Sequence, residues 1–472
     1  MYEKKDYLGM FLFALGLISL LYMFIAPISN IFIHVDEHWT YTLINLPFMD
    51  AMKVIIHDVH PPLYYWILYL FTPFGLDNLY TLKVASIVPY ILVMAVSLTK
   101  IRKNYGLLTA GLFVFCIGFM SDFFVEFLTV RMYSWGLFFL LMTFIYYNEV
   151  ISNWDRRSWV LLTAFTLLSA YTQYLFAVTC ALIYLLLLVE ILRNNRDKLR
   201  QFGKSVLALI ILYAPWAVVF AYQLKTQVGD VHEGFHLVNL IHFATCFAVK
   251  SENFMIESVI FKVVAVIFLI ALLAVIWQKK DRLPAQGVFL FYATMAIGIL
   301  GLMSSFCNTM RVRYLIPVIG VFWLAASIAI GKIENRKLLA GMLVLVMILA
   351  GASLIVTVGD MDSRVAYNDE KMDFLNGIDN NDSVIVYNTD YGYRILHEDL
   401  SHTRQYSLGD TYFYSDDIEI CDNLSEILDD NPDKDVYLVL WAKKKINTEY
   451  KNNYTLSEKF NEGHYSFNLV KH

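Results

Sequence analysis

Ionisable residues gather near the start of the chain, directly after its first apolar run. Asp36 and Glu37 come first, and the string His57-Asp58-Val59-His60-Pro61-Pro62 follows. A carboxylate in a partly dehydrated cleft is a suitable general base for an incoming hydroxyl group. Ionisable groups at a membrane face are costly and usually mark chemistry. We therefore expect four catalytic residues here, with the neighbouring His57 binding substrate: Asp36, Glu37, Asp58 and His60.

Simpler interpretations exist for each half of this cluster. Two adjacent acids could be a solvated loop, and Asp58 could cap a helix that the prolines begin, because proline fixes φ and suits the first turn of a helix. Neither interpretation explains both histidines. Carboxylates and histidines together could also bind a divalent cation, so the sequence leaves the metal requirement open.

The composition predicts a membrane protein that crosses the bilayer many times. The chain has 472 residues, of which 58% are hydrophobic and 17% charged, and its mean hydropathy is +0.52. These values exclude an ordinary soluble multidomain protein. The N-terminal apolar run is too long for the core of a signal peptide and lacks a cleavage site, so we expect an uncleaved first helix. Five scattered cysteines without a CxxC pair indicate neither a disulfide framework nor a cysteine zinc site.

Apolar runs close to the roughly 20 residues that a helix needs to cross a bilayer predict eleven spans. They cover about residues 8–29, 80–99, 106–124, 132–150, 158–172, 174–192, 205–223, 256–277, 285–304, 313–330 and 337–358. Basic clusters fall in alternate loops, which by the positive-inside rule are cytoplasmic. The N-terminus is then inside, and the first loop and the C-terminal tail lie outside. This topology requires that residues 63–74, which are apolar but short and rich in Tyr and Trp, lie flat on the outer surface.

The tail from residue 359 onward differs in composition from the rest. Acidic residues outnumber basic ones about two to one in it. Val384–Tyr387 and Val436–Trp441 have the pattern of short buried strands, and a helix is expected near Asn423. We therefore divide the chain into a transmembrane catalytic domain (1–358) and a small extracytoplasmic α/β domain (359–472). The tail contains no glycine-rich phosphate loop.

Other residues with a plausible substrate role lie on the same predicted outer face. Arg131 and Arg313 could clamp a phosphate through paired hydrogen bonds, although an arginine at this depth can also simply extend to lipid phosphates. Tyrosines at such positions equally fit an aromatic belt. The substrate-binding candidates are His57, Arg131, Tyr133, Tyr171, Arg311 and Arg313.

Taken together, these motifs resemble the GT-C membrane glycosyltransferases. The resemblance covers about residues 8–360 and depends on Asp36-Glu37 after the first span, the string Asp58-x-His60-Pro-Pro-Leu, and weaker Arg-Met-Tyr, Tyr-Thr-x-Tyr and Arg-Tyr-Leu motifs. The chain is most similar to glycosyltransferase family 39 and its relatives, which include protein O-mannosyltransferases and the aminoarabinose transferases of lipid A.

The resemblance implies a polyprenyl-phosphate sugar as donor and a hydroxyl group on a glycan, lipid or protein as acceptor, without nucleic acid. It implies that Asp36 deprotonates the acceptor, that Asp58 and His60 lie near both substrates, and that Arg131 and Arg313 hold the departing phosphate. One base and several cations are enough, because a lipid phosphate leaves without protonation. Direct displacement would invert the anomeric centre.

The sequence also departs from these relatives. No large insertion matches the lumenal domain of the eukaryotic mannosyltransferases, and Asp58-Val59-His60 replaces the Glu-Lys of the aminoarabinose enzymes. We therefore expect a plasma-membrane transferase with neither of these two acceptor specificities. Two alternatives remain: a transporter, which predicts ionisable residues near mid-span, and another ligase or polymerase of lipid-linked glycans.

Overall fold

The computed structural model describes residues 2–29, 35–74, 79–120, 129–227, 247, 256–279, 316–388, 396, 400, 402–408, 418–441, 453–461 and 465–471. These residues separate into two compact units. The first contains residues 1–31 and 44–361, and the second contains residues 32–43 and 362–472.

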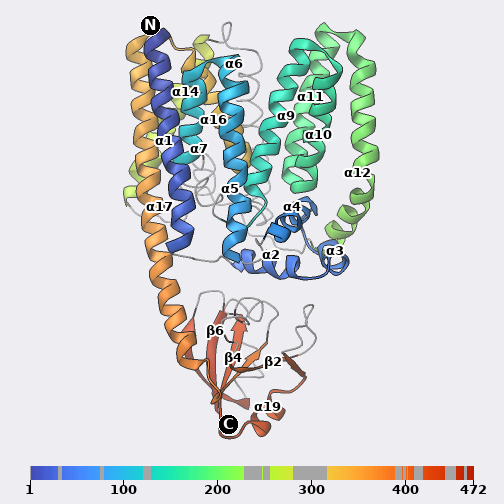
Figure 1. Cartoon of the computed structure of the whole chain (residues 1–472), viewed down its shortest axis with the longest axis vertical. Coiled ribbons are helices and arrows are strands. Elements are labelled where there is room, and N and C mark those ends of the chain that lie inside the picture. Colours follow the sequence, from blue (N-terminus) through green and yellow to red (C-terminus); the bar gives the residue numbers. More distant parts are fainter. Residues whose placement is uncertain are drawn as a thin grey trace. The chain divides into compact units, whose positions relative to one another are not determined.

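The first unit is a bundle of long apolar helices (Figure 1). Seven helical stretches within the described residues are long and apolar enough to cross a membrane. The helices of the bundle are α1 (Tyr2–Ser29), α5 (Leu79–Val96), α7 (Leu107–Phe119), α9 (Tyr133–Asn153), α10 (Arg156–Thr172), α11 (Tyr174–Asn194), α12 (Leu199–Gln227), α14 (Ile256–Lys279), α16 (Ile316–Gly331) and α17 (Arg336–Ile378). Short connecting helices are η2 (Ser97–Ile101), α6 (Arg102–Tyr105) and η3 (Arg196–Lys198).

The prediction of a polytopic helical protein with a small C-terminal sheet domain is confirmed. Ten of the eleven predicted spans coincide with these helices, and the span at 285–304 lies outside the described residues. The cytoplasmic and outer assignments of the loops stay predictions.

Glycines let α1 and α7 pack with their backbones in contact. A Cβ atom on Gly111 would lie 1.9 Å from the Gly9 carbonyl oxygen, and one on Gly9 would lie 2.5 Å from the Leu107 carbonyl oxygen. Lipid tails are as apolar as leucine, so transmembrane helices associate through this kind of close packing rather than through hydrophobic burial. The two helices therefore depend on the missing side chains.

Two short helices lie at the end of the bundle where α5 begins and α12 ends (Figure 1). They are α3 (Phe48–Ile56) and α4 (Leu63–Phe71), and α4 continues into the 3₁₀ turn η1 (Thr72–Phe74). The apolar run 63–74 thus forms a helix too short to span, as the sequence predicted. At the same end, Gln173 alone links α10 to α11, and its side-chain oxygen caps α11 by accepting from the Leu175 N–H at 2.6 Å.

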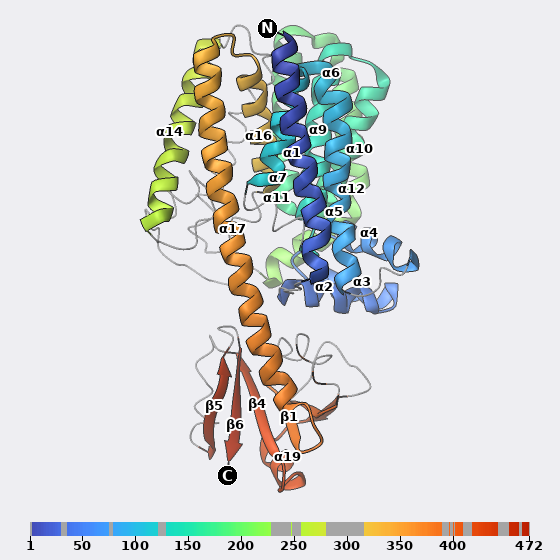
Figure 2. The same cartoon turned by 60° about the vertical axis from the view of Figure 1, so that its left-hand side comes forward.

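The second unit is a small α/β domain with a six-stranded sheet in the order β3-β2-β1-β4-β6-β5. Figure 2 shows β1, β4, β6 and β5 side by side. The first four strands in that order are parallel, and β6 is antiparallel to β4 and β5. The strands are β1 (Ser383–Tyr387), β2 (Arg404–Leu408), β3 (Glu419–Cys421), β4 (Asp435–Trp441), β5 (Thr455–Asn461) and β6 (Tyr465–Lys471), with helix α19 (Leu424–Asp430) between β3 and β4.

Buried apolar side chains of β1 and β4 form the centre of this sheet. Val384, Val386, Val436 and Leu438 are at most 1% exposed and share one core cluster with α19. Strands that are buried in this way have nearly continuous apolar sequences, which explains why these two were predicted. Phe374 in the last turns of α17 stacks on Phe460 of β5 at a centroid distance of 5.0 Å.

The second unit also includes most of helix α2 (Val35–Asn45), since residues 32–43 belong to it. The described part of α17 runs without a break across residue 358, where the sequence shows its change of composition. The domain boundary at 358/359 therefore falls inside one helix, and the division into two functional domains stays a prediction.

Candidate active site

The turn between α3 and α4 carries the His-Asp-x-His-Pro-Pro string. Helix α3 ends at Ile56, the His57 N–H donates to the Val54 carbonyl at 2.9 Å, and the Asp58 N–H donates to the Ile55 carbonyl at 3.1 Å. Pro62 then occupies the residue position directly before α4, without a side-chain capping hydrogen bond. A helix end followed by two prolines restricts the backbone on both sides of Asp58 and His60, so their side chains leave a well-defined turn.

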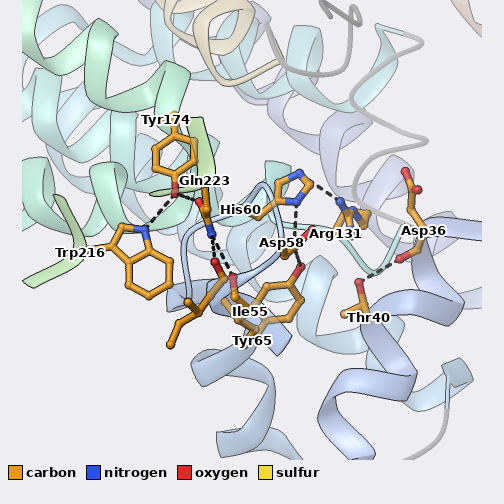
Figure 3. Close-up of polar contacts among 11 residues, drawn as sticks. Asp36, Thr40, Ile55, Asp58, His60, Tyr65, Arg131, Tyr174, Trp216 and Gln223 are labelled. Atoms are coloured by element: carbon orange, nitrogen blue, oxygen red, sulfur yellow. Dashed lines mark hydrogen bonds and ion pairs between the residues drawn. The ribbon is translucent and has the colours of Figure 1, made fainter. Parts of the chain in front are cut away.

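Asp58, His60 and Arg131 form a line of hydrogen bonds (Figure 3). Asp58 Oδ2 lies 3.1 Å from His60 Nδ1, and His60 Nε2 lies 3.3 Å from an Arg131 guanidinium nitrogen. Because the guanidinium only donates, His60 Nε2 accepts, and the ring proton is therefore on Nδ1, where it is donated to Asp58. This arrangement holds the His60 ring between an acid and a cation.

Tyr65 is a further hydrogen-bond partner of Asp58. Its hydroxyl, carried by α4, donates to Asp58 Oδ2 at 3.1 Å. The Tyr65 side chain is fully buried, and both burial and the negative charge of Asp58 raise its pKa well above the usual value. Tyr65 therefore stays a neutral donor to Asp58.

Asp58 is ionised despite being largely buried. Burial alone would raise the pKa of its carboxyl group, but the contact with His60, the Val59 backbone N–H and the Arg131 guanidinium together lower that pKa below its usual value. Hydrogen bonds to the charged form and a nearby cation both favour the carboxylate. The line therefore holds a fixed negative charge at one end and a fixed positive charge at the other.

Arg131 reaches this line from the segment that leads into α9. Its side chain is 4% exposed, and its backbone N–H donates to the Thr129 carbonyl at 2.8 Å. Tyr133, another predicted substrate-binding residue, is the first residue of α9 and is 1% exposed. A planar guanidinium that is buried and oriented by a neighbour is well suited to bind an oxyanion in a defined direction.

His57 and Tyr171 make contacts outside the line from Asp58 to Arg131. The His57 ring is exposed, its Nδ1 lies 2.8 Å from the Lys53 carbonyl oxygen, and its ring packs edge-on against Tyr222 of α12. The Tyr171 hydroxyl donates to the Leu212 carbonyl of α12 at 2.8 Å. Their roles in substrate binding stay predictions.

Asp36 and Glu37 form the acidic first turn of α2. Within that helix the Thr40 hydroxyl donates to the Asp36 carbonyl oxygen at 3.0 Å (Figure 3). This part of α2 belongs to the second unit, whereas the line from Asp58 to Arg131 belongs to the first. Arg311 and Arg313 lie outside the described residues.

The sequence left open whether a divalent cation is bound, and the described part of the chain bears on this question. No group of three or more His, Cys, Asp or Glu side chains within those residues is placed to hold a metal ion.

The structure adds residues that the sequence analysis missed. Gln223 of α12 is 3% exposed and donates to the Ile55 and Ile56 carbonyls at the end of α3, at 3.0 and 3.2 Å. Tyr174 donates to the Gln223 side-chain oxygen, and Trp216 donates to the Tyr174 hydroxyl at 3.1 Å. Lys83 in α5 is buried at 5% exposure. A polar residue inside a predicted span was the available signal for Gln223 and Lys83.

Solved structures with the same architecture are ArnT from Cupriavidus metallidurans bound to undecaprenyl phosphate and the same protein in the apo state. The TM-scores are 0.62 and 0.63 at 9% and 11% sequence identity, and each comparison covers 96% of this chain and 97% of the ArnT chain. An oligosaccharyltransferase from Archaeoglobus fulgidus, in complex with Zn and sulfate, is similar with a TM-score of 0.50 at 11% identity, over 96% of this chain and 73% of that one.

No protein-family model and no curated protein sequence matches this chain. Identities this low relate folds and not activities. The two ArnT comparisons nonetheless span nearly the whole length of both chains. This chain therefore shares the fold of the two ArnT structures, and this is the fold that its motifs predicted.

Proposed function

We propose that the chain is an inverting glycosyltransferase that moves a sugar from a polyprenyl-phosphate donor to an acceptor hydroxyl group on a glycan, lipid or protein. The observation that carries the proposal is the line from Asp58 through His60 to Arg131. It joins the first loop to the start of α9, on a fold shared with a protein solved bound to undecaprenyl phosphate.

In the proposed reaction the acceptor oxygen attacks the anomeric carbon while the bond from that carbon to the phosphate oxygen breaks. The phosphate leaves with the bonding electrons, and the acceptor proton passes to a carboxylate, which we assign to Asp36 from the sequence. Glu37 beside it is the second acid of this pair. The acceptor is a poor nucleophile as a neutral hydroxyl, so a positioned base is the main requirement on that side.

On the leaving-group side, Arg131 stabilises the charge that develops on the phosphate. His60 accepts from the guanidinium and Asp58 fixes the His60 tautomer, so the cation is already oriented when the bond breaks. Donors and cations fixed in advance lose little reorganisation energy during the reaction. A lipid phosphate needs no protonation, and no second carboxylic acid is required.

The proposal is tested with the full chain in liposomes that contain undecaprenyl-phosphate-linked sugars and a mixture of envelope acceptors. Mass spectrometry follows the release of undecaprenyl phosphate and the appearance of glycosylated product. We expect Asp36→Asn to abolish both signals at unchanged protein abundance. The control is Asp50→Asn, since Asp50 forms only an exposed pair with Lys53 of the same helix.

Arg131→Ala tests the phosphate side in the same liposomes. We expect a lower kcat or a higher KM for the donor, by roughly 100-fold in kcat/KM, the range measured when one oxyanion donor is removed. Arg102→Ala, at an exposed position of α6, controls for the loss of one positive charge. Transport of the lipid-linked sugar across the bilayer without release of undecaprenyl phosphate would instead support the transporter.

A further inference from the structure

Gln223 lies at the point where the second half of the bundle meets the turn that carries Asp58 and His60. The residue is far along the chain, near the end of α12, yet its side-chain amide donates to two carbonyls in the last turn of α3. The last carbonyls of a helix have no partner within the helix. Gln223 supplies donors to two of them.

One of these carbonyls links Gln223 directly to Asp58. The Ile55 oxygen accepts from Gln223 Nε2 at 3.0 Å and from the Asp58 backbone N–H at 3.1 Å. A carbonyl oxygen has two lone pairs, so both hydrogen bonds form together. Any shift of the Gln223 amide therefore acts on the backbone turn that begins with Asp58.

The Gln223 amide is itself held in one orientation. Its oxygen accepts from Tyr174 at the start of α11, and the Tyr174 hydroxyl accepts at 3.1 Å from Trp216, which lies about two turns before Gln223 in α12 (Figure 3). The Tyr174 ring also packs on Phe220 at a centroid distance of 4.4 Å. Because the oxygen faces Tyr174, the two N–H donors must face α3.

The end of α12 also contacts the turn beside Gln223. Tyr222, the neighbour of Gln223, packs edge-on against His57 at a centroid distance of 5.5 Å. The end of α12 therefore contacts the turn on two sides.

We propose that Gln223, oriented by Tyr174, is a positioning residue for the transfer reaction: it fixes the Asp58–His60 turn so that His60 faces Arg131. The inference depends on the proposed function, because its effect is expected on turnover. In this role Gln223 acts through the backbone of the turn and through no contact with a substrate. A displacement of the reacting groups by about 1 Å can reduce a rate by about 100-fold.

The test uses Gln223→Met, which keeps the length of the side chain and removes its donors and its acceptor. We expect kcat to fall by about 100-fold, with the KM for the undecaprenyl-phosphate sugar changed by less than about threefold, because an interaction that only orients the reacting groups is lost. Gln201→Met is the matched control, since Gln201 is exposed on the same helix.

A double-mutant cycle with Tyr174→Phe separates positioning from general packing. If Tyr174 acts by orienting the Gln223 amide, Tyr174→Phe lowers kcat in the wild-type background and adds almost nothing to Gln223→Met. Independent effects that multiply would overturn the proposal. So would a loss of activity that runs in parallel with a lower melting temperature, or a kcat for Gln223→Met equal to that of Gln201→Met.

The wild-type arm keeps this inference distinct from the proposed function. Release of undecaprenyl phosphate by the wild type together with a normal kcat for Gln223→Met refutes the positioning role alone. A wild type that releases no undecaprenyl phosphate from any donor refutes the transferase, and the positioning role with it.

Discussion

Two acid–base pairs in the first loop each join residues two or three positions apart, but they differ in burial and in their further partners. Asp50 and Lys53 lie one turn apart on α3 at 2.7 Å, with side chains that are 51% and 75% exposed. Asp58 and His60 lie at 3.1 Å, with side chains that are 12% and 11% exposed. The shorter contact belongs to the exposed pair, so distance alone does not identify the functional pair.

The difference is in the further partners. An exposed pair on one helix is worth little, typically below about 1 kcal/mol, because water and salt screen it. Asp58 instead accepts from Tyr65 and from His60, and His60 passes the line on to Arg131. Removing one member of a buried, bonded set leaves the others with unmet hydrogen bonds, which is costly.

The largest effect on activity is expected from a substitution at Asp58. We expect Asp58→Asn to reduce kcat by about 100-fold, because the amide no longer fixes the His60 tautomer and the guanidinium loses its orientation. The same change at Asp50 should leave kcat unchanged. Release of undecaprenyl phosphate from the sugar donor, followed in liposomes, measures both variants, and equal activities would remove the distinction between the two pairs.

The close packing of glycines between α1 and α7 predicts an effect on the stability of the bundle. We expect Gly111→Ala to destabilise the bundle by about 1–3 kcal/mol, the usual cost of inserting a methyl group where no space exists. Gly341 of α17 has open space around its Cβ position, so Gly341→Ala is the control. Thermal unfolding in detergent compares them, and a Gly111→Ala variant as stable as the control would contradict the close packing.

A smaller effect is expected on the pH profile. The pKa of Asp58 is lowered in the folded protein, so its carboxylate contributes stability and activity above its ordinary pKa and loses them as the pH falls through the lowered value. His60→Ala removes a contact that lowers the pKa of Asp58, while burial still raises it. We therefore expect the pKa of Asp58 to rise in this variant. The acid limb of the pH profile of kcat/KM should therefore move to higher pH. An unchanged limb would show that His60 does not control the ionisation of Asp58.

Local sequence patterns predicted much of the fold. The proline-bounded run 63–74 was too short to span, and it forms α4 and η1. Strands β1 and β4 have continuous apolar sequences and were predicted, whereas β5 has mostly exposed side chains and gave no such pattern. The long helix α17 continues through polar residues after 358, where the change of composition indicated a boundary.

The candidate site was predicted only in part. Residue types and spacing identified Asp58, His60 and Arg131, and the structure brings these three together. Gln223 could be noticed as a polar residue in a predicted span, but its partners could not be predicted, because they are backbone carbonyls 167 and 168 residues earlier in the chain. Hydrogen bonds to backbone atoms depend on tertiary packing and leave no motif in the sequence.

A double-mutant cycle between Asp58→Asn and Arg131→Ala tests whether the two residues act through one hydrogen-bonded line, with kcat/KM for release of undecaprenyl phosphate as the measured quantity. Residues that act through one hydrogen-bonded line have strongly non-additive effects. We expect the double variant to be about as slow as the slower single variant. Losses that multiply would contradict it, because Asp58 and Arg131 would then act independently.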